Sequence, residues 1–155
     1  MKSDNSSRVR RPTVKARPPV ETAVASRRVV SVDLPPEPSS ATRARQLARE
    51  HVAECPAAVI DTVALLVTEL VTNAVLHART ELHLVIETEP GVVRLRVEDH
   101  SPGTPVLRHY DTDDVTGRGL ALVDMFAARW GVDSRPGGKS VWCEIEIPSS
   151  DQDGQ

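Results

Sequence analysis

Aromatic side chains and cysteines are scarce in this chain of 155 residues. Tryptophan, tyrosine and phenylalanine together make up 3% of the sequence, so an aromatic platform on which nucleic-acid bases stack is not expected. The hydrophobic core must instead be built from Val, Leu, Ile and Ala. The two cysteines, Cys55 and Cys143, are too few for a disulfide framework and lack metal-type spacing, so we expect reduced, structural thiols. The five histidines are scattered and do not indicate zinc.

No segment is expected to be a signal peptide or to span a membrane. The apolar runs fall short of the roughly 20 residues that a spanning helix needs. With no membrane partner indicated, the simplest expectation is a cytoplasmic protein. Hydrophobic residues (39%) and charged residues (26%) occur in proportions that are ordinary for one globular domain with a tail.

The net charge of −3 conceals a basic N-terminal segment. Residues 1–27 combine Ser, Arg, Pro and Val without periodicity and contain seven Lys or Arg against two acidic residues. We predict that they form a disordered basic tail. Such a tail could contact nucleic acid or an acidic partner, although a solvated extension is the simpler interpretation. Because no aromatic residues alternate with the basic ones, direct nucleic-acid binding is not expected.

The remaining sequence predicts one domain over residues 28–148 and a flexible C-terminus over 149–155. Apolar and polar residues alternate or recur in patterns that predict a strand, two helices, a hairpin, a long loop, a third helix and a second hairpin. The predicted strands are 28–34, 81–89, 92–100, 130–134 and 140–147, and the predicted helices are 39–52, 56–78 and 119–130. Ser39 or Ser40 is expected to cap the first helix.

Two of these helices have recognisable core faces. In the second helix the apolar stripe consists of Val59, Val63, Leu66, Leu70 and Ala74, so this helix is expected to be mostly buried. In the third helix the residues expected toward the core are Leu120, Val123, Met125 and Phe126. The order of elements predicts an α+β two-layer sandwich, in which a mixed, mostly antiparallel sheet carries three helices on one face.

The second helix also carries polar residues one turn apart, Glu69 and Asn73, with His77 one turn later. Residues at i, i+4 and i+8 lie along one strip of a helix. The neutral carbonyl oxygen of Asn73 can ligate Mg²⁺ when phosphates and waters complete the coordination. Glu69 could accept a proton from an attacking hydroxyl or water. An ordinary solvated helix face is the simpler interpretation of this motif alone.

Two later segments contain residues suited to a nucleotide. The stretch "VEDHSPGTP" ends a strand at Asp99, whose carboxylate can accept a hydrogen bond from the amine of adenine, and Gly103 lets the backbone approach the ring. The stretch "TGRGLALV" places Gly117, Arg118 and Gly119 directly before a helix, where backbone amides and a guanidinium can bind phosphate. It is not a Walker loop. A plain turn and a flexible helix entry are the respective alternatives.

In order and separation, these three segments resemble the N box and the two glycine boxes of the ATPase superfamily that includes gyrase, heat-shock chaperones, histidine kinases and mismatch-repair proteins. Within it, "ELVTNAVLHA", "GRGLALV", "RWGV" and "GGKSVW" resemble the small anti-sigma-factor serine/threonine kinases, especially actinobacterial ATP-binding regulators. The resemblance covers about residues 28–148. It implies a Bergerat-type ATP-binding fold, with ATP and Mg²⁺ as cofactors.

The resemblance also implies roles for individual residues. Glu69 would be the general base, Asn73 would hold Mg²⁺, and Asp99 would bind adenine. The other nucleotide-binding residues that it implies are His77, Gly103, Thr116, Gly117, Arg118, Gly119, Leu120 and Ser140. Residues 104–116 would form an ATP lid. Ser101 departs from the family pattern, because a glycine is usual at this position, and this departure bears on lid closure and phosphoryl transfer.

The leading functional hypothesis is an ATP-binding anti-sigma factor that phosphorylates a serine on an anti-sigma antagonist and so controls sigma-factor-dependent transcription. The resemblance implies a sigma factor, a STAS-type antagonist and a second copy of the chain as partners. The alternative is a non-catalytic ATP-binding adaptor that binds a partner protein. Histidine-kinase action is disfavoured because no helical hairpin with a phosphoacceptor histidine precedes the domain, and gyrase-like action would need further domains.

Overall fold

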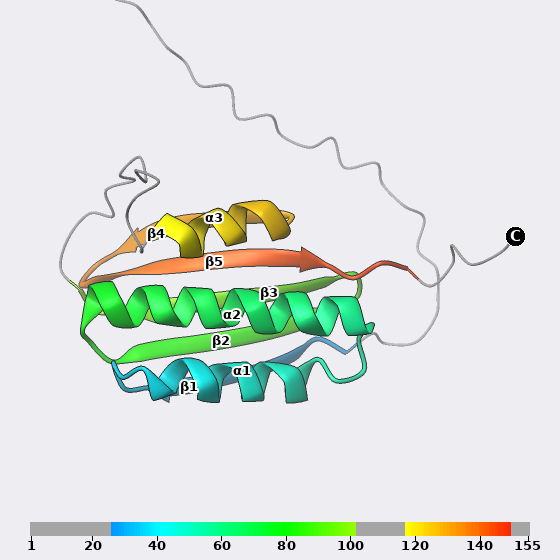
Figure 1. Cartoon of the computed structure of the whole chain (residues 1–155), viewed down its shortest axis with the longest axis horizontal. Coiled ribbons are helices and arrows are strands. Elements are labelled where there is room, and N and C mark those ends of the chain that lie inside the picture. Colours follow the sequence, from blue (N-terminus) through cyan, green and yellow to red (C-terminus); the bar gives the residue numbers. More distant parts are fainter. Residues whose placement is uncertain (1–25, 102–116, 150–155) are drawn as a thin grey trace, which may run out of the picture.

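The computed structural model describes residues 26–101 and 117–149, which form five strands and three helices (Figure 1). In chain order these are β1 (Arg28–Leu34), α1 (Ser39–His51), α2 (Ala57–Ala78), β2 (Leu82–Glu89), β3 (Val92–Asp99), α3 (Gly117–Phe126), β4 (Arg129–Arg135) and β5 (Gly138–Glu146). The predicted lid, all of the predicted basic tail except its last two residues, and the C-terminus from residue 150 lie outside the described residues.

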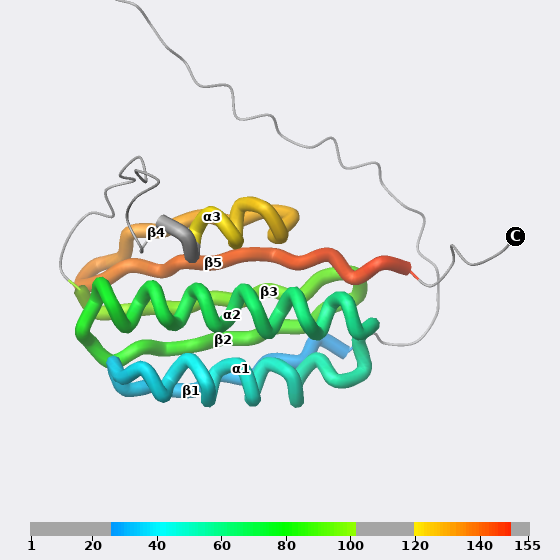
Figure 2. The backbone as a smooth tube through the Cα atoms, viewed as in Figure 1, coloured from blue at the N-terminus to red at the C-terminus, as the bar shows by residue number. Residues whose placement is uncertain are grey.

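The strands form one sheet in the order β1-β2-β3-β5-β4. The three helices cover one face of this sheet, and α2 lies between α1 and α3 (Figure 2). The predicted two-layer sandwich is therefore confirmed. All four strand pairings are antiparallel, so within the described strands the sheet has no parallel pair, although a mixed sheet was expected.

The core lies between α2 and the central strands. All five residues of the predicted α2 stripe are buried, and they pack against alternate residues of the sheet such as Leu84, Leu95 and Cys143. Alternation along β2, β3 and β5 places one set of side chains under the helices and the other set on the opposite, open face. The position of α2 at the centre of the helical layer explains its high apolar content.

The expectation that every apolar run falls short of the length of a spanning helix was wrong for α2. By length and composition alone, α2 could cross a membrane, because it has 22 residues and a stretch of 18 of them has a mean hydropathy of 1.8. Central core helices share this property, and α2 contacts both neighbouring helices and three strands of the sheet. Its apolar face is therefore accounted for by packing within the domain.

Two local predictions were also wrong. Met125 and Phe126 of α3 are 71% and 47% exposed, whereas Leu120 and Val123 are buried as expected. Met125 follows Val123 by two residues, which is about 200° around a helix, and Phe126 is the last residue of α3. At the start of α1, the N-cap position belongs to Pro38 and has no side-chain cap.

The predicted capping serines have other roles. Ser40 is buried, and its Oγ donates a hydrogen bond to the carbonyl oxygen of Pro35 at 2.6 Å. This bond ties the first turn of α1 to the end of β1. The side chain of Ser40 therefore stabilises the strand-to-helix connection instead of capping a helix amide.

Both cysteines are free, as expected. Cys143 is fully buried in the core, and burial raises the pKa of its thiol to about 12. Because the thiolate is the reactive form, Cys143 is a packing residue.

Candidate functional site

The three predicted motifs converge at one end of the sheet (Figure 1). At this end α2 finishes, β3 finishes at Asp99, α3 begins, and β5 begins at Gly138. The antiparallel register explains the convergence, because Asp99 pairs with Lys139 at the start of β5. Arg79, in the left-handed conformation with φ of 52°, ends α2 and turns the chain toward β2.

Asn73 lies on α2 near this end, and its side chain is partly buried. Its Oδ1 atom is shielded from solvent and has no hydrogen-bond partner within the described part of the chain. A buried carbonyl oxygen without a partner is costly, so the position calls for a donor or a cation. Glu69, one turn earlier, is also partly buried, whereas His77, one turn later, is exposed.

The arrangement at Asn73 fits a Mg²⁺ ion that has only one protein ligand. Within residues 26–101 and 117–149, no group of three or more His, Cys, Asp or Glu side chains is placed to hold a metal. A Mg²⁺ bound through Asn73 would therefore take its other ligands from nucleotide phosphates and water, which is a common arrangement for this ion.

Asp99 is almost fully buried and its carboxylate is oriented by its neighbours. Its Oδ1 accepts hydrogen bonds from the backbone N–H of Ser101 at 2.9 Å and from the Ser101 hydroxyl at 2.6 Å. Its Oδ2 lies 3.7 Å from Nζ of Lys139. Ser101, which departs from the family pattern, is thus the residue that orients Asp99.

Lys139 was not among the predicted site residues. The resemblance placed Lys139 and Ser140 where the family often has a threonine near the adenine-binding aspartate, but only Ser140 was assigned to the site. The strand register, which pairs Lys139 with Asp99, was needed to single out Lys139. Its ammonium is the basic group that the described structure places beside Asp99. The register also places Ser140 opposite Glu98 and not opposite Asp99.

The remaining predicted residues fall into three groups. Ser140 is buried and its Oγ has no hydrogen-bond partner among the described residues. Gly117, Arg118 and Gly119 form the first turn of α3, the part of a helix whose free amides bind phosphate, and Leu120 is in the core. Gly103 and Thr116 lie outside the described residues.

Gly138 brings the start of β5 against the backbone of Asp99. A Cβ atom on Gly138 would lie 1.9 Å from the carbonyl oxygen of Asp99. No side chain fits such a space. This contact places β5 and the end of β3 close enough for Lys139 to reach the Asp99 carboxylate.

Replacing Gly138 by alanine is expected to destabilise the domain by about 2 kcal/mol, because the new methyl group must displace backbone atoms. Urea unfolding followed by circular dichroism measures the change. The control is Gly137→Ala, at a position with φ of +79° and open space around it, which should cost about 1 kcal/mol from backbone strain alone. An equal decrease in the free energy of unfolding for the two variants would contradict the close contact between Gly138 and the carbonyl oxygen of Asp99.

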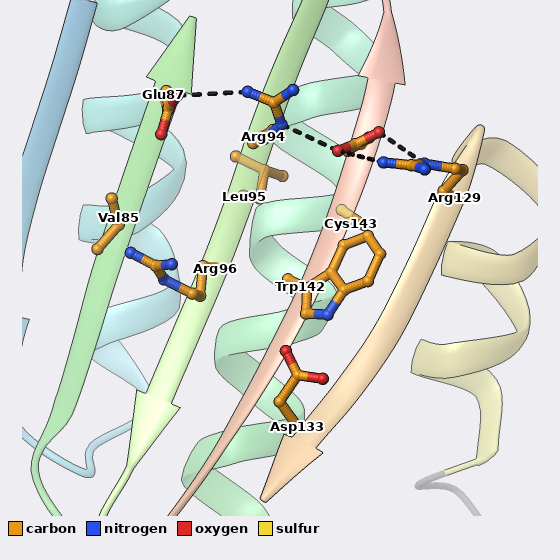
Figure 3. A pocket seen from close by; sticks show the side chains of 10 residues that line it. Val85, Glu87, Arg94, Leu95, Arg96, Arg129, Asp133, Trp142 and Cys143 are labelled. Atoms are coloured by element: carbon orange, nitrogen blue, oxygen red, sulfur yellow. Dashed lines mark hydrogen bonds and ion pairs between the residues drawn. The ribbon is translucent and has the colours of Figure 1, made fainter. Parts of the chain in front are cut away.

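A cavity lies on the open face of the sheet, away from the helices (Figure 3). Its volume is about 300 Å³. One edge is a row of alternating charges across four strands, formed by Glu87, Arg94, Glu144 and Arg129. Nε of Arg94 and Nε of Arg129 each donate to Glu144 at 2.9 Å. This row joins the strands on their solvent side.

The hydrogen bond from Arg129 holds the pKa of Glu144 below its ordinary value of 4.5, and Arg94 adds to the effect. The folded protein therefore takes up this proton less readily than the unfolded chain. The resulting stabilisation is present above about pH 4.5 and is lost as the pH falls through the lower pKa of the folded state.

Replacing Glu144 by glutamine is expected to lower Tm by about 2–4 °C at neutral pH. The difference from the wild type should shrink when the pH falls well below 4.5, because both proteins then lack the charge. Thermal unfolding at the two pH values measures this. Glu146→Gln, an exposed position on the same strand, is the control. A decrease in Tm that is the same at both pH values would contradict the conclusion that Glu144 is charged in the folded protein.

Comparison with known proteins agrees with this fold. Residues 34–145 match the family model for the histidine kinase-like ATPase domain. The match covers well over half of the chain, which therefore belongs to the histidine kinase-like ATPase family, and membership implies ATP binding. A segment of 56 residues is 43% identical to an uncharacterized protein of Streptomyces coelicolor, covering 35% of this chain and 53% of that protein. The matched segment spans about half the length of this curated relative.

Proposed function

We propose that this protein is an ATP-binding anti-sigma factor with serine protein kinase activity on a STAS-type anti-sigma antagonist, and that it controls sigma-factor-dependent transcription. Family membership supports the ATP-binding part of the proposal. The observation that carries the proposal is the buried Oδ1 of Asn73, which has no hydrogen-bond partner among residues 26–101 and 117–149. It lies toward the end of the sheet where Asp99 and the first turn of α3 also lie. Asn73 supports a nucleotide site that uses Mg²⁺.

The groups at this end of the sheet are suited to four separate tasks. Asp99 has an acceptor for the amino group of adenine, and the amides that begin α3 can bind phosphate. Asn73 would hold Mg²⁺, which neutralises phosphate charge when bound. Glu69 would take the proton of an incoming serine hydroxyl, whose oxygen forms a bond to the terminal phosphorus while ADP leaves. Positioning and charge account for most of the catalysis of such a transfer.

The partners follow from the same proposal. A sigma factor and its antagonist would bind to this chain in turn. Phosphorylation of the antagonist would release this chain, which would then hold the sigma factor inactive. We expect a homodimer that acts in the cytoplasm and makes no direct contact with nucleic acid.

Titration of the purified protein with Mg-ATP by calorimetry tests the first half of the proposal, and saturable binding is expected. Incubation with labelled ATP and a STAS-type antagonist tests the second half, and label is expected on a serine of the antagonist. Binding without transfer would favour a non-catalytic ATP-binding adaptor. Absence of Mg-ATP binding would overturn both functions.

A further inference from the structure

The Asp99 carboxylate has two unlike oxygens. Oδ1 already accepts two hydrogen bonds, both from Ser101. A carboxylate oxygen has about two lone-pair sites, so Oδ1 is filled. Within the described part of the chain Oδ2 accepts no hydrogen bond and is therefore the oxygen with acceptor capacity left. The Asp99 side chain that carries it is only 2% exposed.

Lys139 supplies a positive charge without occupying Oδ2. Its Nζ lies 3.7 Å from Oδ2, which is within the range of an ion pair but beyond an ordinary hydrogen bond. A buried carboxylate needs a compensating charge. The distance leaves the lone pairs of Oδ2 available to another donor.

The backbone holds Lys139 in this place. Lys139 pairs directly with Asp99 across β3 and β5, and the preceding Gly138 makes the close contact with the Asp99 carbonyl oxygen. The Lys139 side chain is itself 21% exposed. By contrast, the neighbouring Arg135 is 48% exposed and pairs with Glu98, which lies next to Asp99 on β3.

We propose that Lys139 is a positioning residue that determines base selectivity: together with Ser101 it holds the Asp99 carboxylate so that Oδ2 meets the 6-amino group of a purine nucleotide. The inference rests on the proposed function, because it concerns the base end of the same nucleotide site. A 6-oxo purine presents an acceptor in place of the amino donor and is repelled by Oδ2. Selection of ATP over ITP is therefore the property that Lys139 controls.

The test compares Mg-ATP with Mg-ITP, which has the same triphosphate and a 6-oxo base, by calorimetry on the full chain. The wild type is expected to bind Mg-ATP at least roughly tenfold more tightly than Mg-ITP. Lys139→Met should lose about tenfold in affinity for Mg-ATP and change little toward Mg-ITP. Retained Mg-ITP binding also shows that the variant is folded. Lys139→Arg keeps the charge and should keep most of the selectivity.

Arg135→Met is the matched control, since it removes a positive charge at the same end of the sheet from a residue paired with Glu98. It should leave the ratio of the two affinities unchanged. If Lys139→Met is unfolded, Lys139→Gln takes its place.

Three outcomes would overturn the inference. Equal binding of Mg-ATP and Mg-ITP by the wild type would show that Oδ2 does not meet the amino group. An equal loss for both nucleotides in Lys139→Met would show that the ammonium acts on the triphosphate. Unchanged Mg-ATP binding in that variant would show that the ion pair is only structural. If the wild type binds neither nucleotide, the proposed function fails and the inference fails with it, a result distinct from these three.

Discussion

Replacing Asn73 by alanine is expected to weaken the binding of Mg-ATP by roughly a hundredfold, equivalent to about 2.7 kcal/mol. Asn73 has the one buried side-chain oxygen on α2 that lacks a partner among the described residues, and its loss would remove the protein ligand of the ion. The large effect follows from the small number of protein ligands, because no neighbouring carboxylate cluster in the described residues can replace Asn73. Calorimetric titration with Mg-ATP measures the change.

The control for this prediction is Thr72→Ala, the adjacent and exposed position on α2. It should bind Mg-ATP as the wild type does. A second comparison uses ATP with a chelator in place of Mg²⁺, where the wild type and Asn73→Ala should bind almost equally. If Asn73→Ala loses affinity to the same extent without the metal, the Asn73 oxygen contacts the nucleotide or supports the fold instead of holding Mg²⁺.

If the proposed kinase activity is present, replacing Glu69 by glutamine is expected to lower the rate of phosphoryl transfer to the antagonist by about 10²–10⁴-fold, while the affinity for Mg-ATP stays within about threefold. Glutamine has nearly the same shape but cannot accept the proton of the serine hydroxyl. Glu69 is one turn from Asn73 and partly buried, so the substitution removes a base without opening a cavity. Single-turnover transfer of labelled phosphate measures the rate.

Asp61→Asn is the control, because it neutralises an exposed carboxylate on the same helix that pairs with Arg49. Transfer by this variant should match the wild type. If Glu69→Gln transfers phosphate normally, Glu69 is not the general base. If Glu69→Gln loses Mg-ATP affinity as severely as Asn73→Ala does, the Glu69 side chain contacts the metal ion or the nucleotide.

Local spacing in the sequence correctly predicted the kind and order of the elements. Helices and strands follow from periods of 3.6 and 2 residues, and the stripe from Val59 to Ala74 is buried as that period requires. Errors arose in the third helix, which was predicted to reach residue 130 although β4 begins at Arg129. Met125 was misplaced because it lies about 200° around the helix from Val123. Phe126 was assigned to the core, but α3 ends there and the side chain is 47% exposed.

The candidate site was predicted in its parts but not in its contacts. Glu69, Asn73 and Asp99 were identified from their residue types and motif order, and the fold brings the ends of α2 and β3 to the same edge. Ser101 was treated as a departure from a pattern, yet its hydroxyl and its backbone N–H orient Asp99. A contact of this kind depends on the local conformation after β3, which residue type alone does not specify.

The sequence by itself determined the two-layer class of fold and the buried face of α2, because both depend on neighbours along the chain. It also supplied the residues proposed to bind a nucleotide, which remain a prediction. Only the tertiary structure decided that Lys139 lies opposite Asp99 and that Oδ1 of Asn73 is buried with no partner among the residues that the structure describes. Strand register and burial are set by contacts between segments distant in sequence, where a slip of one residue moves a side chain to the other face of the sheet.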